Sequence, residues 1–232
     1  MNAFSVLLLI KFLLAFCSIV YELVLAQALS AFLENTVLRY SVTIGLYLFS
    51  MGFGAILAEE KFLKNKFLTL LKVEILLTVL GGGSLAVLHC LDAVNCPRLV
   101  FILAAHLLII VIGVLTGLEV PIVMGMVQEE RGEAENTVLA ADYGGAFLGT
   151  LIFAFIFYPV LGLIPTAFLV AAFNAVVGLL LYTQEQKIPL ELKKIFYAHL
   201  YVLLFLFLVS GVCLIYVPGI NAFFLNMYLN HS

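Results

Sequence analysis

The chain has 232 residues, of which 65% are hydrophobic and 11% charged, and its mean hydropathy is +1.21. So few polar side chains cannot cover a water-soluble globule, which excludes an ordinary soluble enzyme and makes lipid the main solvent. The formal net charge of -3, with basic residues scattered along the chain, also excludes a nucleic-acid-binding surface, because such a surface needs a stripe of Lys and Arg.

The first apolar stretch runs from Phe4 through Leu25, and no small-residue cleavage pattern follows it, so it is predicted to be a membrane span and not a signal peptide. A hydrocarbon core about 30 Å thick needs roughly 20 apolar residues in a helix. Helices are expected because an unclosed strand would leave its backbone polar groups unpaired in lipid. We therefore predict an all-α fold: a polytopic membrane helix bundle of about seven transmembrane helices in one domain, residues 1–232. The expected spans are Ala3 to Leu29, Ser41 to Ala58, Phe67 to Leu88, Leu99 to Val127, Gly144 to Leu161, Pro165 to Tyr182 and Ile195 to Val217.

The basic residues predict the orientation of these spans. They cluster after the second span and before the seventh, with Arg131 between the fourth and fifth, whereas the opposite loops carry Arg39 and Arg98. By the positive-inside rule we expect a multi-pass protein of the cell inner membrane with a cytoplasmic N-terminus. The clustered residues are Lys61, Lys64, Lys66, Lys187, Lys193 and Lys194.

Cysteines and histidines carry no strong signal for a cofactor. Cys90 and Cys96 flank a short loop on the predicted outer face, where a disulfide and two free thiols are both compatible with the spacing. Cys17 and Cys213 fall within spans and are interpreted as small packing residues. The spacing of His89 from the cysteines is not that of a zinc site, so no metal is expected.

Two further motifs resemble cofactor sites. His106 and His199 lie in different spans and could ligate haem only if the fold brought them together, so hydrogen-bonded packing is the preferred interpretation. The glycines at 81–83 follow an apolar run like that of a nucleotide-binding loop, but the run continues to Leu88 as one membrane-length segment. No cofactor is therefore expected.

Glycines indicate where helices pack closely. Gly45, Gly52 and Gly54 lie in the second span, and Gly145 and Gly149 form a G-x-x-x-G pair in the fifth. Small residues at such separations let two helix backbones approach each other. We expect these glycines to be helix-packing residues, with packing inside the monomer favoured over dimerisation.

Ionisable side chains in apolar surroundings are the candidate site, since a charge there is costly unless it is paired or hydrated. Glu22 in the first span, Glu119 in the fourth, and Asp142 and Tyr143 at the start of the fifth meet this criterion and are the predicted substrate-binding residues. Pro121, just after Glu119, is expected to kink or unwind its helix. Two alternatives remain open: the glutamates could be paired carboxylates that fix helix register, and Asp142 could be a helix N-cap.

The other charged residues in the spans have a simpler interpretation. Lys11 and Lys72 are expected to extend toward the cytoplasmic headgroups. Glu74 is two residues from Lys72 and cannot share a helical face with it. A short internal repetition is also present, because Asn35 to Leu38 and Asn136 to Leu139 have the same sequence and each precedes a span. Transporter folds often contain such duplications, although four residues alone are weak evidence.

Several motifs resemble a known family. Tyr21-Glu22-Leu23, the run Glu34 to Ser41 and the glycine-rich stretch Ile44 to Gly54 form a first block. Gly117-Leu118-Glu119-Val120-Pro121, Val138 to Ala146, Pro159 to Leu163 and Asn174-Ala175 follow in order as a second block. Together they resemble the membrane region of transmembrane spermidine synthase-like proteins, and the resemblance covers most of Tyr21 to Gly178.

In that family an aminopropyltransferase domain follows the membrane helices. This chain ends at Ser232, so the resemblance implies the membrane module without its catalytic domain, and enzyme activity is not expected. It implies instead the binding or transport of a small cationic, polyamine-like solute. The alternative is a non-catalytic accessory or anchor subunit, packed against another membrane protein or a second copy through the seventh span and the amphipathic segment Ile220 to Tyr228.

Overall fold

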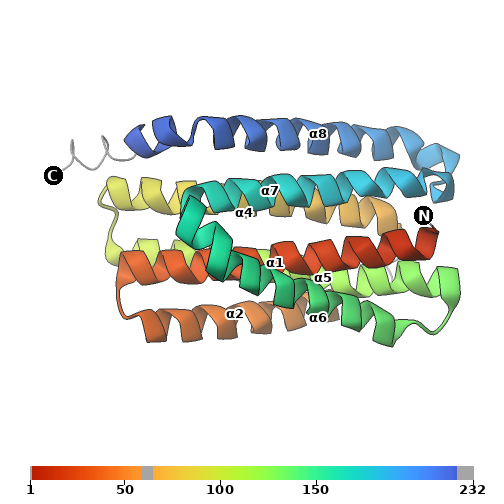
Figure 1. Cartoon of the computed structure of the whole chain (residues 1–232), viewed down its shortest axis with the longest axis horizontal. Coiled ribbons are helices and arrows are strands. Elements are labelled where there is room, and N and C mark those ends of the chain that lie inside the picture. Colours follow the sequence, from red (N-terminus) through yellow and green to blue (C-terminus); the bar gives the residue numbers. More distant parts are fainter. Residues whose placement is uncertain (1, 59–64, 224–232) are drawn as a thin grey trace.

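The computed structural model describes residues 2–58 and 65–223 of the chain. Within these residues seven helices are long and apolar enough to cross a membrane, which confirms the predicted all-α, polytopic fold (Figure 1). The seven helices are α1 Ala3–Leu33, α2 Thr36–Leu57, α4 Lys66–Ala93, α5 Arg98–Arg131, α6 Glu135–Ile152, α7 Leu163–Leu180 and α8 Lys193–Ile215. Short helices extend three of them: the π-helix η1 Phe153–Leu161 continues α6, the 3₁₀ helix η2 Leu181–Lys187 continues α7, and η3 Leu190–Leu192 precedes α8.

Helix α1 lies at the centre of the bundle. It contacts α2, α4, α5, α6 and α7, and buried residues such as Leu7, Leu14 and Leu29 occur along its length. A helix that is apolar all round is expected in such a position. Helix α2 packs mainly on α5, α6 mainly on α1, and α7 on α4, while α8 lies at the edge against α7 and α4 (Figure 1).

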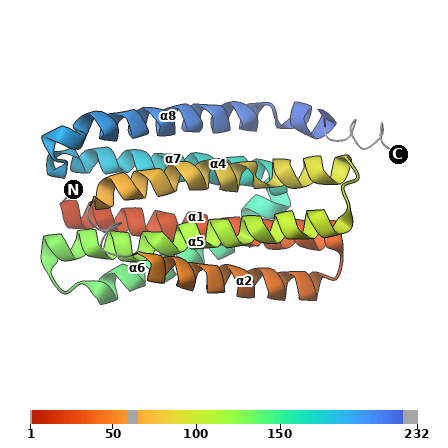
Figure 2. The same ribbon diagram turned by 180° about the vertical axis from the view of Figure 1, so that it is seen from behind.

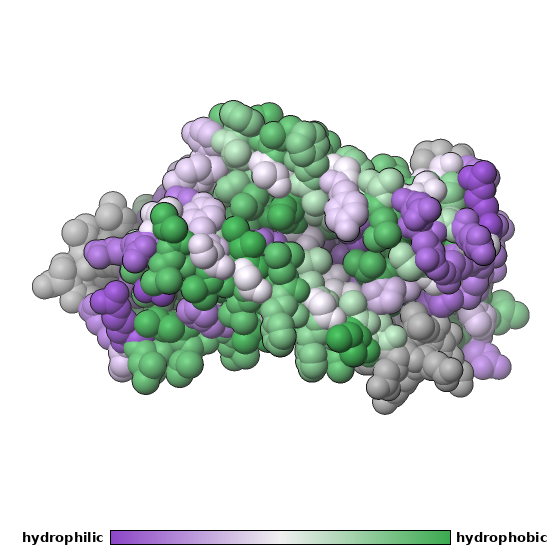
Figure 3. Space-filling view, turned by 90° about the horizontal axis from the view of Figure 1, so that it is seen from below, coloured by the Kyte–Doolittle hydropathy of each residue, from purple (hydrophilic) through white to green (hydrophobic). Residues whose placement is uncertain are grey.

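The molecular surface has the pattern of a membrane protein. In Figure 3 hydrophobic side chains cover the middle of the bundle and hydrophilic ones gather toward its two ends. Large apolar side chains such as Phe49, Ile56 and Phe205 are exposed, which in water would be costly over so wide an area. Lipid is the solvent that fits this surface.

Three of the five predicted packing glycines lie at helix contacts inside the monomer. Gly145 and Gly149 of α6 face the backbone of α1 at Phe12 and Phe16, and Gly54 of α2 faces the backbone of α5. Gly45 and Gly52 are different. Both are exposed, and no atom of the described residues lies within 4 Å of the position that a Cβ would take, so they make no contact between helices of the monomer.

One predicted helix start is wrong, and one predicted unwinding does not occur. Helix α6 begins at Glu135 and not at Gly144, so Asp142 lies inside the helix and is not its N-cap. A hydropathy criterion misses the polar stretch before Gly144, which forms helix although only its Glu, Leu and Ala residues are good helix formers. Helix α5 runs without a break through Pro121. Proline removes one donor, the one that would bind the carbonyl of Gly117, yet the α-helix continues on both sides of it.

The cysteines and the two intramembrane histidines form no metal-binding cluster among the described residues. All four cysteines are free thiols, with Cys90 exposed and Cys17 buried. His106 and His199 each lie 2.7 Å from a backbone carbonyl one turn earlier in their own helices, which agrees with the packing interpretation. Lys61 and Lys64, and the part of the segment Ile220 to Tyr228 beyond Phe223, lie outside the described residues.

Candidate binding site

Four charged side chains from four helices form a cluster inside the bundle. Lys11 of α1 forms an ion pair with Asp142 of α6, with 2.6 Å between Nζ and Oδ1. Glu74 of α4 and Glu119 of α5 are 0% and 1% exposed, and Lys11 is 1% exposed. The charge of Lys11 acts on both glutamates, and Asp142 acts on Glu119. We call these four residues the acid cluster.

The acid cluster holds more acidic than basic groups. Among the described residues, Lys11 is its one cation, and Asp142 is already paired with it. Within the same part of the chain, both carboxyl oxygens of Glu74 and Oε2 of Glu119 are buried without a hydrogen-bond partner. Buried polar atoms are nearly always partnered in folded proteins, because an unpartnered one is costly. The cluster can therefore accept further N–H or O–H donors.

Local sequence explains how the helices bring these groups to one depth. Lys11 and Glu74 each follow the first residue of their helices by eight positions, which is about 12 Å along a helix. Gly145, one turn after Asp142, lets α6 approach the α1 backbone at Phe12, beside Lys11. Gly178 of α7 lies against the side chain of Glu74. Glycines thus close the bundle around the charges.

Polar groups of α7 and α4 surround Glu74. The amide of Asn174 donates to the backbone carbonyl of Glu74 at 3.2 Å and to Thr78 Oγ1 at 3.3 Å. The Thr78 hydroxyl donates to the same carbonyl at 2.7 Å. The ring of Tyr21 packs on Gly81, and its buried hydroxyl has no partner among the described residues. These groups fix the backbone beneath Glu74, and Asn174 also lies close enough to act on its carboxyl group, whose two oxygens have no hydrogen bond of normal geometry among the described residues.

Glu22 lies farther along α1, beyond the acid cluster. It is 4% exposed. Tyr47 of α2 lies within electrostatic range of both Glu22 and Glu119, and its hydroxyl is 3.2 Å from Ser18 Oγ and 3.0 Å from Thr116 Oγ1. Tyr47, Ser18 and Thr116 therefore form a hydrogen-bonded group within electrostatic range of both glutamates.

The structure brings together only some of the predicted site residues. Glu119 and Asp142 lie in the acid cluster, and Glu22 lies farther along α1, but Tyr143 is 70% exposed on the outside of α6 and is left out of the site. Lys11 and Glu74 were missed. Lys11 was expected to reach the headgroups, yet it is buried, whereas Lys72 is exposed. The sequence signal that could have identified both residues is that each is an ionisable side chain inside an apolar span.

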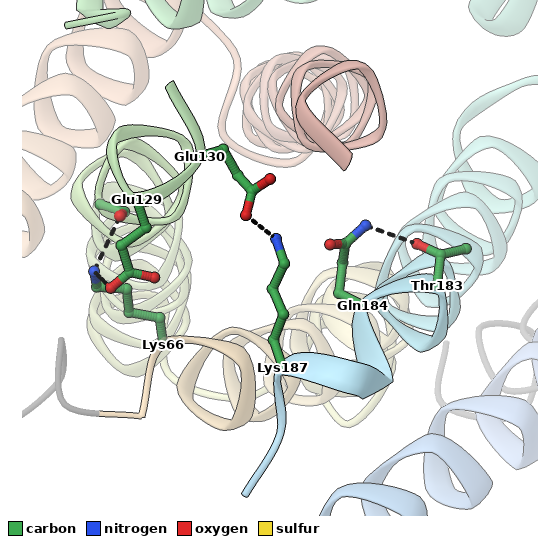
Figure 4. A network of polar contacts seen from close by, with 7 residues as sticks. Lys66, Glu129, Glu130, Thr183, Gln184 and Lys187 are labelled. Atoms are coloured by element: carbon green, nitrogen blue, oxygen red, sulfur yellow. Dashed lines mark hydrogen bonds and ion pairs between the residues drawn. The ribbon is translucent and has the colours of Figure 1, made fainter. Parts of the chain in front are cut away.

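A second polar network lies at the end of the bundle where α4 begins and α5 ends (Figure 4). Lys66 binds Glu129 at 2.6 Å and the carbonyl of Gly125 at 3.0 Å, and Lys187 pairs with Glu130. These pairs connect α5 to α4 and to η2. They lie nearer the surface than the acid cluster, with 61% of the Glu129 side chain exposed.

Comparison with known proteins places the chain among its relatives. It is 38% identical to a polyamine aminopropyltransferase of Leptospira interrogans over 167 residues, which are 70% of this chain and 32% of that protein. It is 35% identical to polyamine aminopropyltransferase 2 of Ralstonia nicotianae over 180 residues, 75% of this chain and 34% of that one. The chain is a homologue of the polyamine aminopropyltransferases.

This homology confirms the family that the sequence motifs indicated. A polyamine aminopropyltransferase of Oceanobacillus iheyensis matches in the same way, at 32% identity over 71% of this chain and 32% of its own length. The chain spans about a third of the length of these polyamine aminopropyltransferases. No family model and no solved structure matches it.

Proposed function

We propose that the chain is an integral membrane module that binds a small organic cation of the polyamine class in the acid cluster. The observation that carries this proposal is the set of three buried carboxyl oxygens, two on Glu74 and one on Glu119, that have no hydrogen-bond partner among the described residues. A protonated amine offers three N–H donors and a positive charge, and supplies what these oxygens lack.

The charges of the acid cluster and the side chains beside it support an aliphatic amine as the ligand. The Lys11–Asp142 pair is neutral overall, so Glu74 and Glu119 are the two acids left to balance a ligand. Cys17 and Tyr21 are buried and lie within electrostatic range of Glu74 and Glu119, so a methylene chain bound there would have apolar and weakly polar neighbours. The relatives are named polyamine aminopropyltransferases, which suggests the ligand class.

Calorimetric titration of the purified 232-residue chain with spermidine tests the proposal. We expect Glu74→Gln and Glu119→Gln each to weaken binding at least about tenfold, which corresponds to about 1.4 kcal/mol. Glu133→Gln is the matched control, because Glu133 is exposed and the change in charge is the same. Thermal unfolding of each variant confirms that the bundle is intact. Unchanged affinity in both cluster variants, or no binding by the wild type, would refute the proposal.

A second function, that of a non-catalytic accessory or anchor subunit, is favoured by the position of α8. The main contacts of this helix are with α7 and α4, and its other side exposes Tyr201, Phe205 and Leu208. Either lipid or a partner protein can cover this apolar face, so an experiment has to separate the two functions. Extraction in mild detergent followed by size-exclusion chromatography separates the two functions: a monomer that binds spermidine supports the first, and a stable hetero-complex without binding supports the second.

A further inference from the structure

The bundle is built from two halves with the same arrangement of helices. In Figure 1 the front layer shows α7, α1 and α6 from top to bottom, and Figure 2, turned by 180° about the vertical axis, shows α4, α5 and α2 in the same order and running in the same directions. One rotation therefore exchanges a first half, α1-α2-α4, with a second half, α5-α6-α7. Since the helices run horizontally in both views, this axis lies in the plane of the membrane. Helix α8 lies outside the repeat.

Packing between the halves is reciprocal. Helix α2 packs mainly on α5 and α6 mainly on α1, and α1 contacts α7 as α5 contacts α4. One glycine contact occurs twice with the roles exchanged: Gly113 of α5 faces the carbonyl of Tyr47 in α2, and Gly149 of α6 faces the carbonyl of Phe16 in α1. Phe16 and Gly113 are counterparts, 97 residues apart.

The same spacing relates residues in the interior. Glu22 and Glu119 are also 97 residues apart. Thr78 of α4 and Asn174 of α7, 96 residues apart, hydrogen-bond to each other, as counterparts close to a two-fold axis do. The repeated Asn-Thr-Val-Leu begins at residue 35 in one half and at residue 136 in the other, with a loop four residues longer in the second. Sequence and packing thus identify the same two halves.

Pockets lie at both ends of the bundle, and two of them share three counterpart positions. One, of about 270 Å³, lies where α1 and α4 end, and the other, of about 210 Å³, lies where α5 and η2 end. The counterparts that line them are Phe32 and Glu129, Asp92 and Ile188, and Cys96 and Leu192. The two pockets therefore correspond in part: the first also uses the start of α5, and the second the start of α4.

We infer that the chain moves a small organic cation across the membrane by exchanging the conformations of its two inverted halves. This inference rests on the proposed binding function. The acid cluster lies between the halves, because Lys11 and Glu74 come from the first and Glu119 and Asp142 from the second. In an inverted repeat, exchanging the conformations of the halves opens the shared site to the opposite face.

The polar contacts at one end provide a way to test this movement. Lys66 and Glu129 join α4 to α5 and so join the two halves, at 2.6 Å. Gln128 and Glu135, at the same end, join α5 to α6 within the second half, at 3.0 Å. A cross-link at the first pair restricts movement between halves, and one at the second pair does not.

Two measurements on the same variants test the inference: uptake of radiolabelled spermidine into liposomes containing the 232-residue chain, and spermidine binding by calorimetry. All variants have the four native cysteines replaced. After treatment with a short cleavable thiol cross-linker, K66C/E129C is expected to lose at least about 90% of uptake while its affinity changes less than about twofold, and reduction restores uptake. The control Q128C/E135C is expected to keep its uptake after the same treatment.

The outcomes separate the inference from the function on which it rests. Binding without uptake by the wild type overturns transport and leaves the binding function in place. Uptake that persists in fully cross-linked K66C/E129C overturns the exchange of the two halves. Absence of spermidine binding in the wild type overturns the proposed function itself.

Discussion

Replacing Lys11 by Met removes the cation of the acid cluster and keeps an unbranched side chain of similar length. Lys11 is 1% exposed, its Nζ lies 2.6 Å from Asp142, and its charge also acts on Glu74 and Glu119. The variant leaves three acidic groups close together without that charge. We expect a large loss of stability, since the carboxylate of Asp142 loses the cation that compensates its charge.

The size of the loss follows from the geometry. Removing one partner of a buried ion pair costs about 3–5 kcal/mol, because the other charge is left uncompensated. Asp142 keeps 21% of its side chain exposed, so some solvation remains and the lower figure applies. Asp142→Asn is expected to cost less, about 1.5 kcal/mol, because Lys11 still interacts with Glu74 and Glu119.

Unfolding in mixed micelles with increasing sodium dodecyl sulfate, followed by circular dichroism, measures these free energies. Lys72→Met is the matched control: Lys72 is exposed, and a surface substitution of this kind changes stability by about 0.5 kcal/mol or less. The reasoning fails if Lys11→Met is as stable as Lys72→Met, or if Asp142→Asn costs more than Lys11→Met.

Two further predictions concern packing and orientation. Gly145→Ala should lower the free energy of unfolding by about 1–3 kcal/mol, because its Cβ would overlap the backbone of Phe12. Gly45→Ala, at an exposed position, should be neutral or stabilise the bundle by up to about 1 kcal/mol. Equal stabilities of the two variants in the same titration would contradict the α1–α6 contact. In a variant whose only cysteine is Cys90, a membrane-impermeant maleimide should react from outside intact cells, since Cys90 is exposed in the last turn of α4 and the loop that follows is predicted to be external. Labelling only in inverted vesicles would reverse the predicted orientation.

The helices could be predicted from sequence because lipid imposes one strong constraint. Every backbone polar group in a span must be paired, so an apolar run of sufficient length becomes a helix whatever its neighbours are. All seven predicted spans match helices on this basis. The start of α6 was wrong because Glu135 to Tyr143 is too polar for a hydropathy criterion, although it packs as helix against α1.

The direction in which each side chain faces was harder to predict. Helices α1 and α4 are apolar nearly all round, so no periodicity shows that Lys11 and Glu74 face the interior. The glycines show the same limit. Gly45 and Gly145 both begin closely spaced glycine sets, yet one faces lipid and the other a helix backbone. Which face of a helix points to the interior depends on the helices that pack against it, and these are far away in sequence. The pattern of residues within one helix therefore does not predict that face.

Glu22 and Glu119 illustrate how the two halves repeat a backbone without repeating its charges. They are counterparts, 97 residues apart, but Lys11 and Asp142 act on Glu119, whereas the counterpart of Lys11 in the second half is Leu108. The Lys11–Asp142 pair joins α1 to α6, and among the described residues it has no charged equivalent between α5 and α2 at the other end. The ion pair therefore stabilises one arrangement of the halves over its inverse, so the two end states of an exchange differ in free energy even though their helices are related by rotation. For the same reason Glu119, with an unpartnered Oε2 beside these charges, is the informative position for a binding test, and Glu22 is not.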